Sequence, residues 1–164
     1  MPNAYEGKNY DRPTGMAKEH LTFWANDVFK YIENNYQADP LNRSYFGYSV
    51  SATFGSYILL TKPNMFKNYI LGSPETLFDN HLVHEYEPIT KKILEPINAN
   101  VFISVGAIES LDSIKHAASL AQYLRAKKSA KPHLKFTVFE AADHGTAFPI
   151  FAIKSLYWLA EIYQ

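Results

Sequence analysis

The chain has 164 residues, of which 47% are hydrophobic and 15% aromatic, so it is long enough and apolar enough for one domain with a packed core. Its 16 basic and 16 acidic residues cancel, which gives no reason to expect nucleic acid or an anionic membrane as a partner. The absence of cysteine excludes disulfides, thiolate metal ligands and thiol catalysis.

No targeting or membrane-spanning segment is recognisable in the sequence. No apolar run approaches the roughly 20 residues of a membrane span, and residues 1–10 lack the basic-then-apolar order of a signal peptide. The chain also has no internal repeat, low-complexity tract or linker. We therefore expect a single domain over 1–164 that is soluble and, as written, cytoplasmic.

The predicted secondary structure is one helix followed by four strand–helix pairs. The helices carry apolar residues at helical spacing, and the strands are short apolar or aromatic runs. In chain order the elements are helix 17–36, strand 45–48, helix 52–61, strand 68–71, helix 81–94, strand 101–105, helix 111–128, strand 135–140 and helix 148–163. This alternation predicts a three-layer α/β fold, in which helices cover both faces of a mainly parallel sheet of about four strands.

Polar side chains follow each of the four predicted strands near its end: Ser49, Ser73, Glu109 and His144. Because the carboxyl ends of parallel strands meet at one edge of a sheet, we expect these side chains to gather there. Ser49 follows its strand directly, within Gly47-Tyr48-Ser49-Val50-Ser51, and opens a helix. A serine at such a turn, with a histidine after the last strand, indicates a serine hydrolase.

The remaining polar groups suggest how this serine would be activated. A serine is a poor nucleophile without a base, and His144, in a turn with Gly145, is suited to accept its proton. The best placed carboxylate to orient the imidazole is Glu109, with Asp112 as its rival. Asp143 is a poor candidate because neighbouring side chains diverge at the end of a sheet. The order serine, acid, histidine is that of the α/β-hydrolases.

The other site predictions follow from position along the chain. The backbone N–H of Val50, at a helix N-terminus, is the candidate oxyanion donor. The candidates for the substrate pocket are Tyr48, Ser73 and Phe148. No metal and no cofactor are predicted, since His81 and His84 would share a helix face but have no evident third ligand.

At these residues the chain resembles the esterase family of α/β-hydrolases that includes enterochelin (siderophore) esterases, feruloyl and acetylxylan esterases, S-formylglutathione hydrolases and mycolyltransferases. The resemblance covers nearly the whole chain and looks closest to the siderophore-esterase branch. The segments that carry it are 31–36, 46–49, 54–60, 66–74, 101–109 and 143–149. It implies a truncated α/β-hydrolase fold, with Ser49 as nucleophile, His144 as base and Glu109 as triad acid.

The chain departs from the family pattern in two ways. The family usually has Gly-Gly where this chain has Ser51-Ala52, although both residues are small enough for close packing of helix and strand. The chain also begins where family members are about halfway through the fold. The first strands are then absent, together with the loop that carries the second oxyanion-hole N–H, and losing one such donor costs roughly 10²–10³ in rate.

Without those strands, the strand over 45–48 would lie at the edge of the sheet. An unpaired edge favours association with another chain. We expect this edge to pair with a second copy, which gives a homodimer, or else with a missing N-terminal half.

The sequence thus leads to two hypotheses about function. The first is a serine carboxylic-ester hydrolase that acts on a small-molecule ester through an acyl-enzyme, without a cofactor. The second is a catalytically impaired remnant or fragment that acts as a binding or assembly module. Acyl transfer to a sugar differs from the first hypothesis only in the acceptor.

Overall fold

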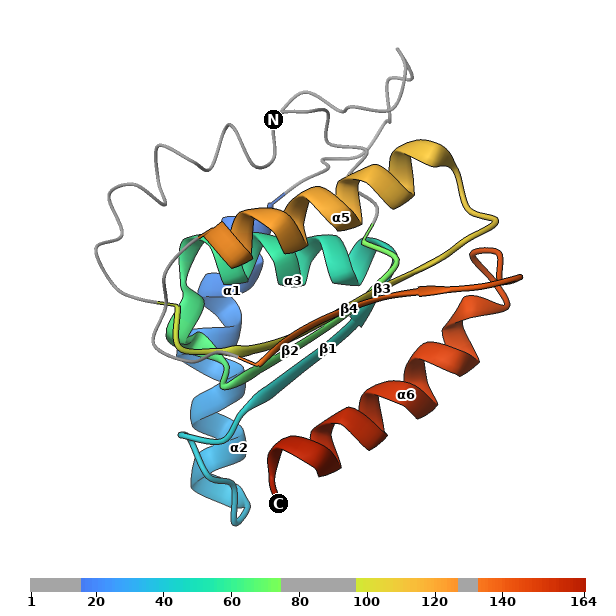
Figure 1. Ribbon diagram of the computed structural model, residues 1–164. Coiled ribbons are helices and arrows are strands. Elements are labelled where there is room, and N and C mark those ends of the chain that lie inside the picture. The colour runs from blue at the N-terminus through green and yellow to red at the C-terminus, as the bar shows by residue number, and fades with distance from the viewer. Residues whose placement is uncertain (1–15, 75–96, 127–132) are drawn as a thin grey trace.

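The computed structural model describes residues 16–74, 97–126 and 133–164 (Figure 1). Within these ranges the strands are β1 Ser44–Tyr48, β2 Asn68–Gly72, β3 Asn100–Gly106 and β4 Leu134–Phe139. The α-helices are α1 Ala17–Phe23, α2 Phe29–Asn35, α3 Val50–Thr61, α5 Leu111–Ala126 and α6 Ala147–Ile162. The four strands form one sheet in the order β1-β2-β3-β4, and every neighbouring pair is parallel. The predicted fold class is confirmed.

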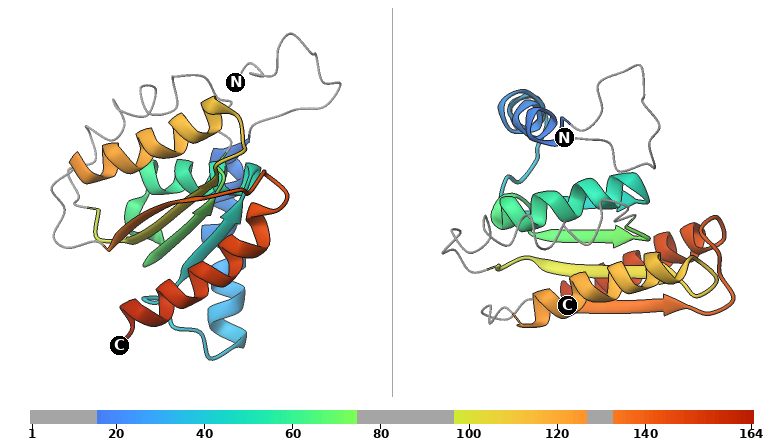
Figure 2. Two further views of the ribbon diagram at one scale, coloured as in Figure 1. Left: turned by 45° about the vertical axis from the view of Figure 1, so that its right-hand side comes forward. Right: turned by 90° about the horizontal axis from the view of Figure 1, so that it is seen from above.

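Helices cover both faces of the sheet, as the alternation of strands and helices predicts. Figure 2 shows α3 and α5 on one side of the sheet and α6 on the other. Two apolar cores result, one between the sheet, α3 and α5 with Leu71 and Val105, the other beneath α6 with Phe102 and Phe151. All five residues of β2 are buried, because this strand is covered on both faces.

The predicted first helix is present, but a π-helical turn over Trp24–Val28 separates α1 from α2. In this turn the N–H of Phe29 donates to the carbonyl of Trp24, five residues earlier. A π turn brings residues five apart toward one face, whereas in an α-helix they diverge. Both rings therefore pack on Phe66, with centroid distances of 6.3 Å for Trp24 and 5.6 Å for Phe29. Nothing in the apolar spacing indicates this turn.

Two sequence-based expectations fall outside what the structure describes. The predicted helix over 81–94 lies outside the described residues, and so does the end of the predicted helix 111–128. None of the helices in the described ranges has the length and apolar character that a membrane span requires.

Among the described strands, β1 lies at one edge of the sheet, as expected. Along the strand, the N–H and C=O groups of successive residues point alternately toward β2 and away from it. The N–H of Ser49 donates to the carbonyl of Gly72 in β2, so the backbone groups of Tyr48 and Phe46 face away from β2. The outward backbone groups of Tyr48 are hydrogen bonded to Ser51. Its Oγ accepts the N–H of Tyr48 at 2.9 Å and donates to the carbonyl of Tyr48 at 2.7 Å. The open part of the edge therefore centres on Phe46.

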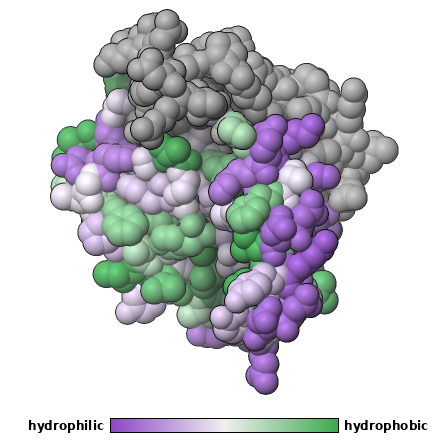
Figure 3. All heavy atoms as spheres, turned by 180° about the vertical axis from the view of Figure 1, so that it is seen from behind, coloured by the Kyte–Doolittle hydropathy of each residue, from purple (hydrophilic) through white to green (hydrophobic). Residues whose placement is uncertain are grey.

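The β1 edge lies at the back of the view in Figure 1. Seen from above, β2, β3 and β4 follow one another toward the front of that view, and β1 lies beyond β2 (Figure 2). Figure 3, taken from behind, shows hydrophobic side chains gathered on this face. Phe46 remains 45% exposed, although its ring packs against Phe151 at a centroid distance of 4.8 Å.

The pairing of this edge with a second copy of the chain stays a prediction. Two β1 strands related by a twofold axis at Phe46 would exchange their outward N–H and C=O groups and remove the two rings from water. We expect sedimentation velocity to show a dimer whose population grows with concentration. Phe46→Lys should weaken the dimer, because a charge on an edge strand opposes pairing.

The matched control for this prediction is Leu111→Lys, which places the same charge at an exposed apolar residue of α5, where 74% of Leu111 is accessible. It should leave the dimer intact. A wild-type monomer at every concentration, or equal weakening by both substitutions, would contradict the predicted interface.

The loops that follow β3 and β4 touch at Gly106. A Cβ at this residue would lie 2.3 Å from the carbonyl oxygen of Ala142, closer than atoms can approach. The same carbonyl accepts the N–H of Ile108 at 3.0 Å, so backbone bonds hold the two loops together. Glycine at 106 therefore allows the contact that joins the carboxyl ends of β3 and β4.

We expect Gly106→Ala to destabilise the fold by about 1–3 kcal/mol, as overpacking generally does. Gly145→Ala is the matched control in the loop after β4, because the nearest atom to its added Cβ would lie 3.6 Å away. Urea unfolding of both variants measures the difference. Equal midpoints for the two variants would show that the loop contact tolerates a methyl group.

Candidate active site

The turn from β1 to α3 is made by a single residue, Ser49. Its backbone has φ 58° and ψ −127°, a conformation that residues other than glycine rarely adopt. The helix begins at once, because the N–H of Thr53 donates to the carbonyl of Ser49 at 3.0 Å. Gly47 allows this sharp reversal, since a Cβ there would lie 2.7 Å from the carbonyl oxygen of Ser51. Such a turn exposes a serine hydroxyl above the sheet.

Three predicted side chains meet at this turn. His144 Nε2 lies 3.0 Å from Ser49 Oγ, and His144 Nδ1 lies 2.8 Å from Glu109 Oε2. The three residues follow β1, β3 and β4, and the serine and the histidine are 95 residues apart in sequence. The arrangement fits a nucleophile, a base and a group that orients the base.

The two candidate acids differ in their surroundings. The Glu109 side chain is only 3% exposed, whereas 42% of the His144 side chain is accessible. Asp112 lies in the first turn of α5 with 77% of its side chain exposed, and its carboxylate is 3.9 Å from Lys115. The carboxylate that is hydrogen bonded to His144 is thus that of Glu109. The catalytic roles assigned to these residues stay predictions.

The second oxygen of the Glu109 carboxylate is also hydrogen bonded. Oε1 accepts the N–H of Gly106 at 2.7 Å and lies 2.6 Å from the hydroxyl oxygen of Ser73. Ser73 is buried and directs its hydroxyl at this carboxylate. Its predicted place in a substrate pocket stays untested.

The loop that carries His144 is shaped by its neighbour, Asp143. One carboxylate oxygen of Asp143 accepts the N–H of Gly145 at 3.0 Å and the N–H and hydroxyl of Thr146 at 2.8 Å each. The hydrogen bonds from Thr146 hold the pKa of Asp143 below its ordinary value. Asp143 therefore organises the turn ahead of α6. The pattern of an aspartate three residues before a threonine could have indicated this turn.

Tyr48 fixes the same loop from the opposite side. Its hydroxyl donates to the carbonyl of His144 at 2.5 Å, and its ring lies 5.2 Å from the imidazole. Burial raises the pKa of Tyr48, so the phenol remains a donor through the neutral range. Phe148, 45% exposed, packs edge-on against the Tyr48 ring at 5.1 Å. The expectation that Tyr48 and Phe148 line a substrate pocket stays a prediction.

Val50 is the first residue of α3, and its backbone N–H is one of those that a helix N-terminus leaves without a helical acceptor. The helix dipole adds partial positive charge at this point. The position therefore suits a donor to an oxyanion formed beside Ser49, which stays a prediction.

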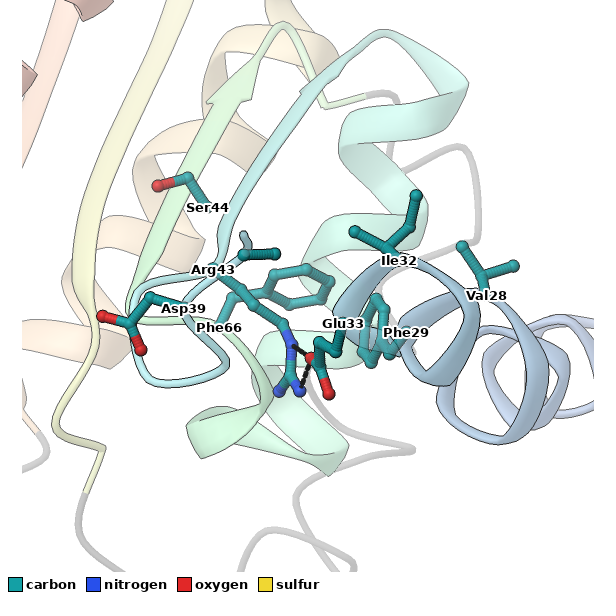
Figure 4. Close-up of a pocket in the computed structure, with 9 residues that line it drawn as sticks. Val28, Phe29, Ile32, Glu33, Asp39, Arg43, Ser44 and Phe66 are labelled. Atoms are coloured by element: carbon teal, nitrogen blue, oxygen red, sulfur yellow. Dashed lines mark hydrogen bonds and ion pairs between the residues drawn. The ribbon is translucent and has the colours of Figure 1, made fainter. Parts of the chain in front are cut away.

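A cavity of about 260 Å³ lies elsewhere, between α2 and the beginning of β1. Figure 4 shows Arg43 and Glu33 facing one another at its wall, and they form a hydrogen-bonded ion pair. The guanidinium also stacks over Phe29 at 4.5 Å. Ser44 lines this cavity and lies at the opposite end of β1 from Ser49. The cavity is therefore separate from the site around Ser49.

The described ranges contain no group of three or more His, Asp or Glu side chains that could hold a metal ion. His81 and His84, whose spacing was the weak indication of a metal site, lie outside the described residues.

Comparison with known proteins connects this site to esterases. No family model matches the chain. Over 163 residues the chain is 26% identical to ferri-bacillibactin esterase BesA of Bacillus subtilis (strain 168). This match covers 95% of the chain and 55% of that enzyme. The crystal structure of the BES protein from Bacillus cereus superposes with a TM-score of 0.74 at 29% identity, over 94% of this chain and 58% of the other.

A third structure extends the likeness in fold. Siderophore hydrolase EstA from Aspergillus nidulans has a TM-score of 0.78 at 19% identity, over 96% of this chain and 61% of EstA. The chain thus spans between 55% and 61% of the length of these relatives, which fits the expectation that it corresponds to the C-terminal half of such an enzyme. In sequence the chain is thus similar to ferri-bacillibactin esterase BesA, and its fold is that of the α/β-hydrolases.

Proposed function

We propose that the chain carries the catalytic groups of a serine carboxylic-ester hydrolase. Ser49 Oγ attacks the ester carbonyl while His144 accepts its proton, and Glu109 orients the imidazole and balances its charge. The proton then passes from His144 to the leaving alkoxide, and water releases the acyl group from Ser49 by the same route. The observation that carries this proposal is the row of two hydrogen bonds, 3.0 Å from Ser49 to His144 and 2.8 Å from His144 to Glu109.

The substrate class is proposed from the relatives. BesA is an esterase of ferri-bacillibactin, and EstA is a siderophore hydrolase. We propose that this chain acts on, or derives from an enzyme that acts on, an ester of the siderophore type. Transfer of the acyl group to an alcohol would use the same serine, because only the acceptor changes.

A second candidate function is a non-catalytic binding or assembly module of the same fold. It is favoured by the coverage, since the chain spans only 55% of BesA. In α/β-hydrolases the second oxyanion donor comes from a loop in the earlier part of the fold. If Val50 N–H acts alone, the rate falls by roughly 10²–10³.

Labelling with a fluorophosphonate distinguishes these two functions, because the probe reacts with an activated serine and needs no knowledge of the substrate. We expect slow labelling that peptide mass spectrometry locates on Ser49. Ser49→Ala should abolish it, and His144→Gln should slow it by roughly 10²–10⁴, the usual contribution of a general base.

Ser110→Ala is the control, since Ser110 is an exposed serine in the loop after β3 and its hydroxyl lies 2.8 Å from that of Ser113. It should label like the wild type. A folded wild-type chain without Ser49-dependent labelling would favour the binding module.

A further inference from the structure

We infer that Ser73 is a positioning residue of this site: its hydroxyl holds the Glu109 carboxylate and so governs how firmly that carboxylate binds His144. This inference rests on the proposed function of Ser49, His144 and Glu109. In this role Ser73, which follows β2, acts on Glu109 and does not contact the substrate.

The contacts of Glu109 are divided between its two oxygens. Oε2 binds His144 at 2.8 Å, while Oε1 binds Ser73 Oγ at 2.6 Å and the N–H of Gly106 at 2.7 Å. With 3% of the side chain exposed, water contributes little to its solvation. Ser73 is thus the one side-chain donor to Oε1 among the hydrogen bonds of the described residues, and a hydrogen bond to a charged acceptor is stronger than one between neutral groups.

The backbone of Ser73 is strained, which points to a function for its side chain. Its φ is 43°, in the left-handed region that glycine adopts without cost. Ser49 also has a positive φ, and the two serines follow β1 and β2, which pair along their length. The N–H of Ser73 donates to the carbonyl of Ser104 at 2.7 Å, which fixes this conformation. Strain retained at a serine, where glycine would relax it, fits a required hydroxyl.

Ser73 also contacts the group that holds the histidine loop. Its Oγ lies 3.1 Å from the hydroxyl of Tyr48, which in turn lies 2.5 Å from the carbonyl of His144. Each hydroxyl has one proton to donate, and we assign it to the shorter of its contacts. Ser73 therefore donates to the Glu109 carboxylate, and Tyr48 donates to the carbonyl of His144. The strand of the nucleophile and the loops of the acid and the base therefore meet at one partly buried cluster.

Loss of the Ser73 hydroxyl has a defined electrostatic consequence. The hydrogen bond withdraws negative charge from Glu109, and without it the carboxylate attracts the protonated imidazole more strongly. In the described part of the chain, the titratable groups that face His144 are Glu109, Tyr48 and Asp143. We therefore expect the pH midpoint of the His144 ring to move upward in variants that lack the hydroxyl.

The test compares Ser73→Ala with Ser73→Gly. Both remove the hydroxyl, but glycine relieves the positive φ, so Ser73→Gly should unfold at a higher urea concentration than Ser73→Ala. We expect both to raise the pH midpoint of the His144 ring signal, followed by NMR. Both should also slow fluorophosphonate labelling of Ser49 by roughly tenfold to a hundredfold, the value of a hydrogen bond to a charged group.

Ser104→Ala is the matched control. Ser104 is a buried serine on the neighbouring strand β3, and its hydroxyl has no hydrogen-bond partner among the residues that the structure describes. Its replacement should leave the midpoint and the labelling rate unchanged. The ring signal is assigned by its loss in His144→Gln.

The outcomes separate this inference from the proposed function. Ser73→Gly could keep the wild-type midpoint of His144 and the wild-type labelling rate of Ser49, while Ser73→Ala changes both. That result would show that only the backbone conformation at residue 73 matters, and it would overturn the inference. Unchanged midpoints in both variants would also overturn it. If the wild type does not label at Ser49, the proposed function fails, while the titration of His144 still decides whether Ser73 acts through Glu109.

Discussion

The one-residue turn at Ser49 is the constraint on which the rest of the site depends. β1 must end and α3 must begin around a residue whose φ is 58°, a backbone region that costs of the order of 1–3 kcal/mol. Two contacts stabilise it: the close approach that Gly47 permits, and the buried hydroxyl of Tyr45, which donates to the carbonyl of Ser51 at 2.5 Å. Burial raises the pKa of Tyr45 to about 12, so this donor keeps its proton. The hydroxyl of Ser49 consequently has a fixed position to which the other loops must conform.

Because the sheet is parallel, the carboxyl ends of its four strands lie close together. Glu109, Ser73 and Tyr48 form a partly buried polar cluster in which both oxygens of the carboxylate have partners. Buried polar groups stabilise a structure only when they are satisfied, and a satisfied network holds its members rigidly. The same cluster bonds the backbone of His144 through Tyr48, so His144 is fixed both at its ring and at its main chain.

Ser51 joins the site to the edge of the sheet. Its one hydroxyl satisfies both outward backbone groups of Tyr48. An edge strand that closes its own hydrogen bonds is less available to further strands, so Ser51 shortens the open edge to the region of Phe46.

The sequence by itself determined the order of the elements, the parallel sheet, and Ser49 and His144 as two of the side chains that meet at the turn between β1 and α3. It did so because periodicity, glycine turns and placement after a strand are local properties. Only the tertiary structure decided between Glu109 and Asp112 as the partner of His144, since that depends on the loop contact at Gly106 and not on spacing. The bond from Ser73 to Glu109 joins residues 36 apart, and that from Tyr48 to His144 joins residues 96 apart. Such bonds follow from strand register and helix packing, which no local pattern along the chain specifies.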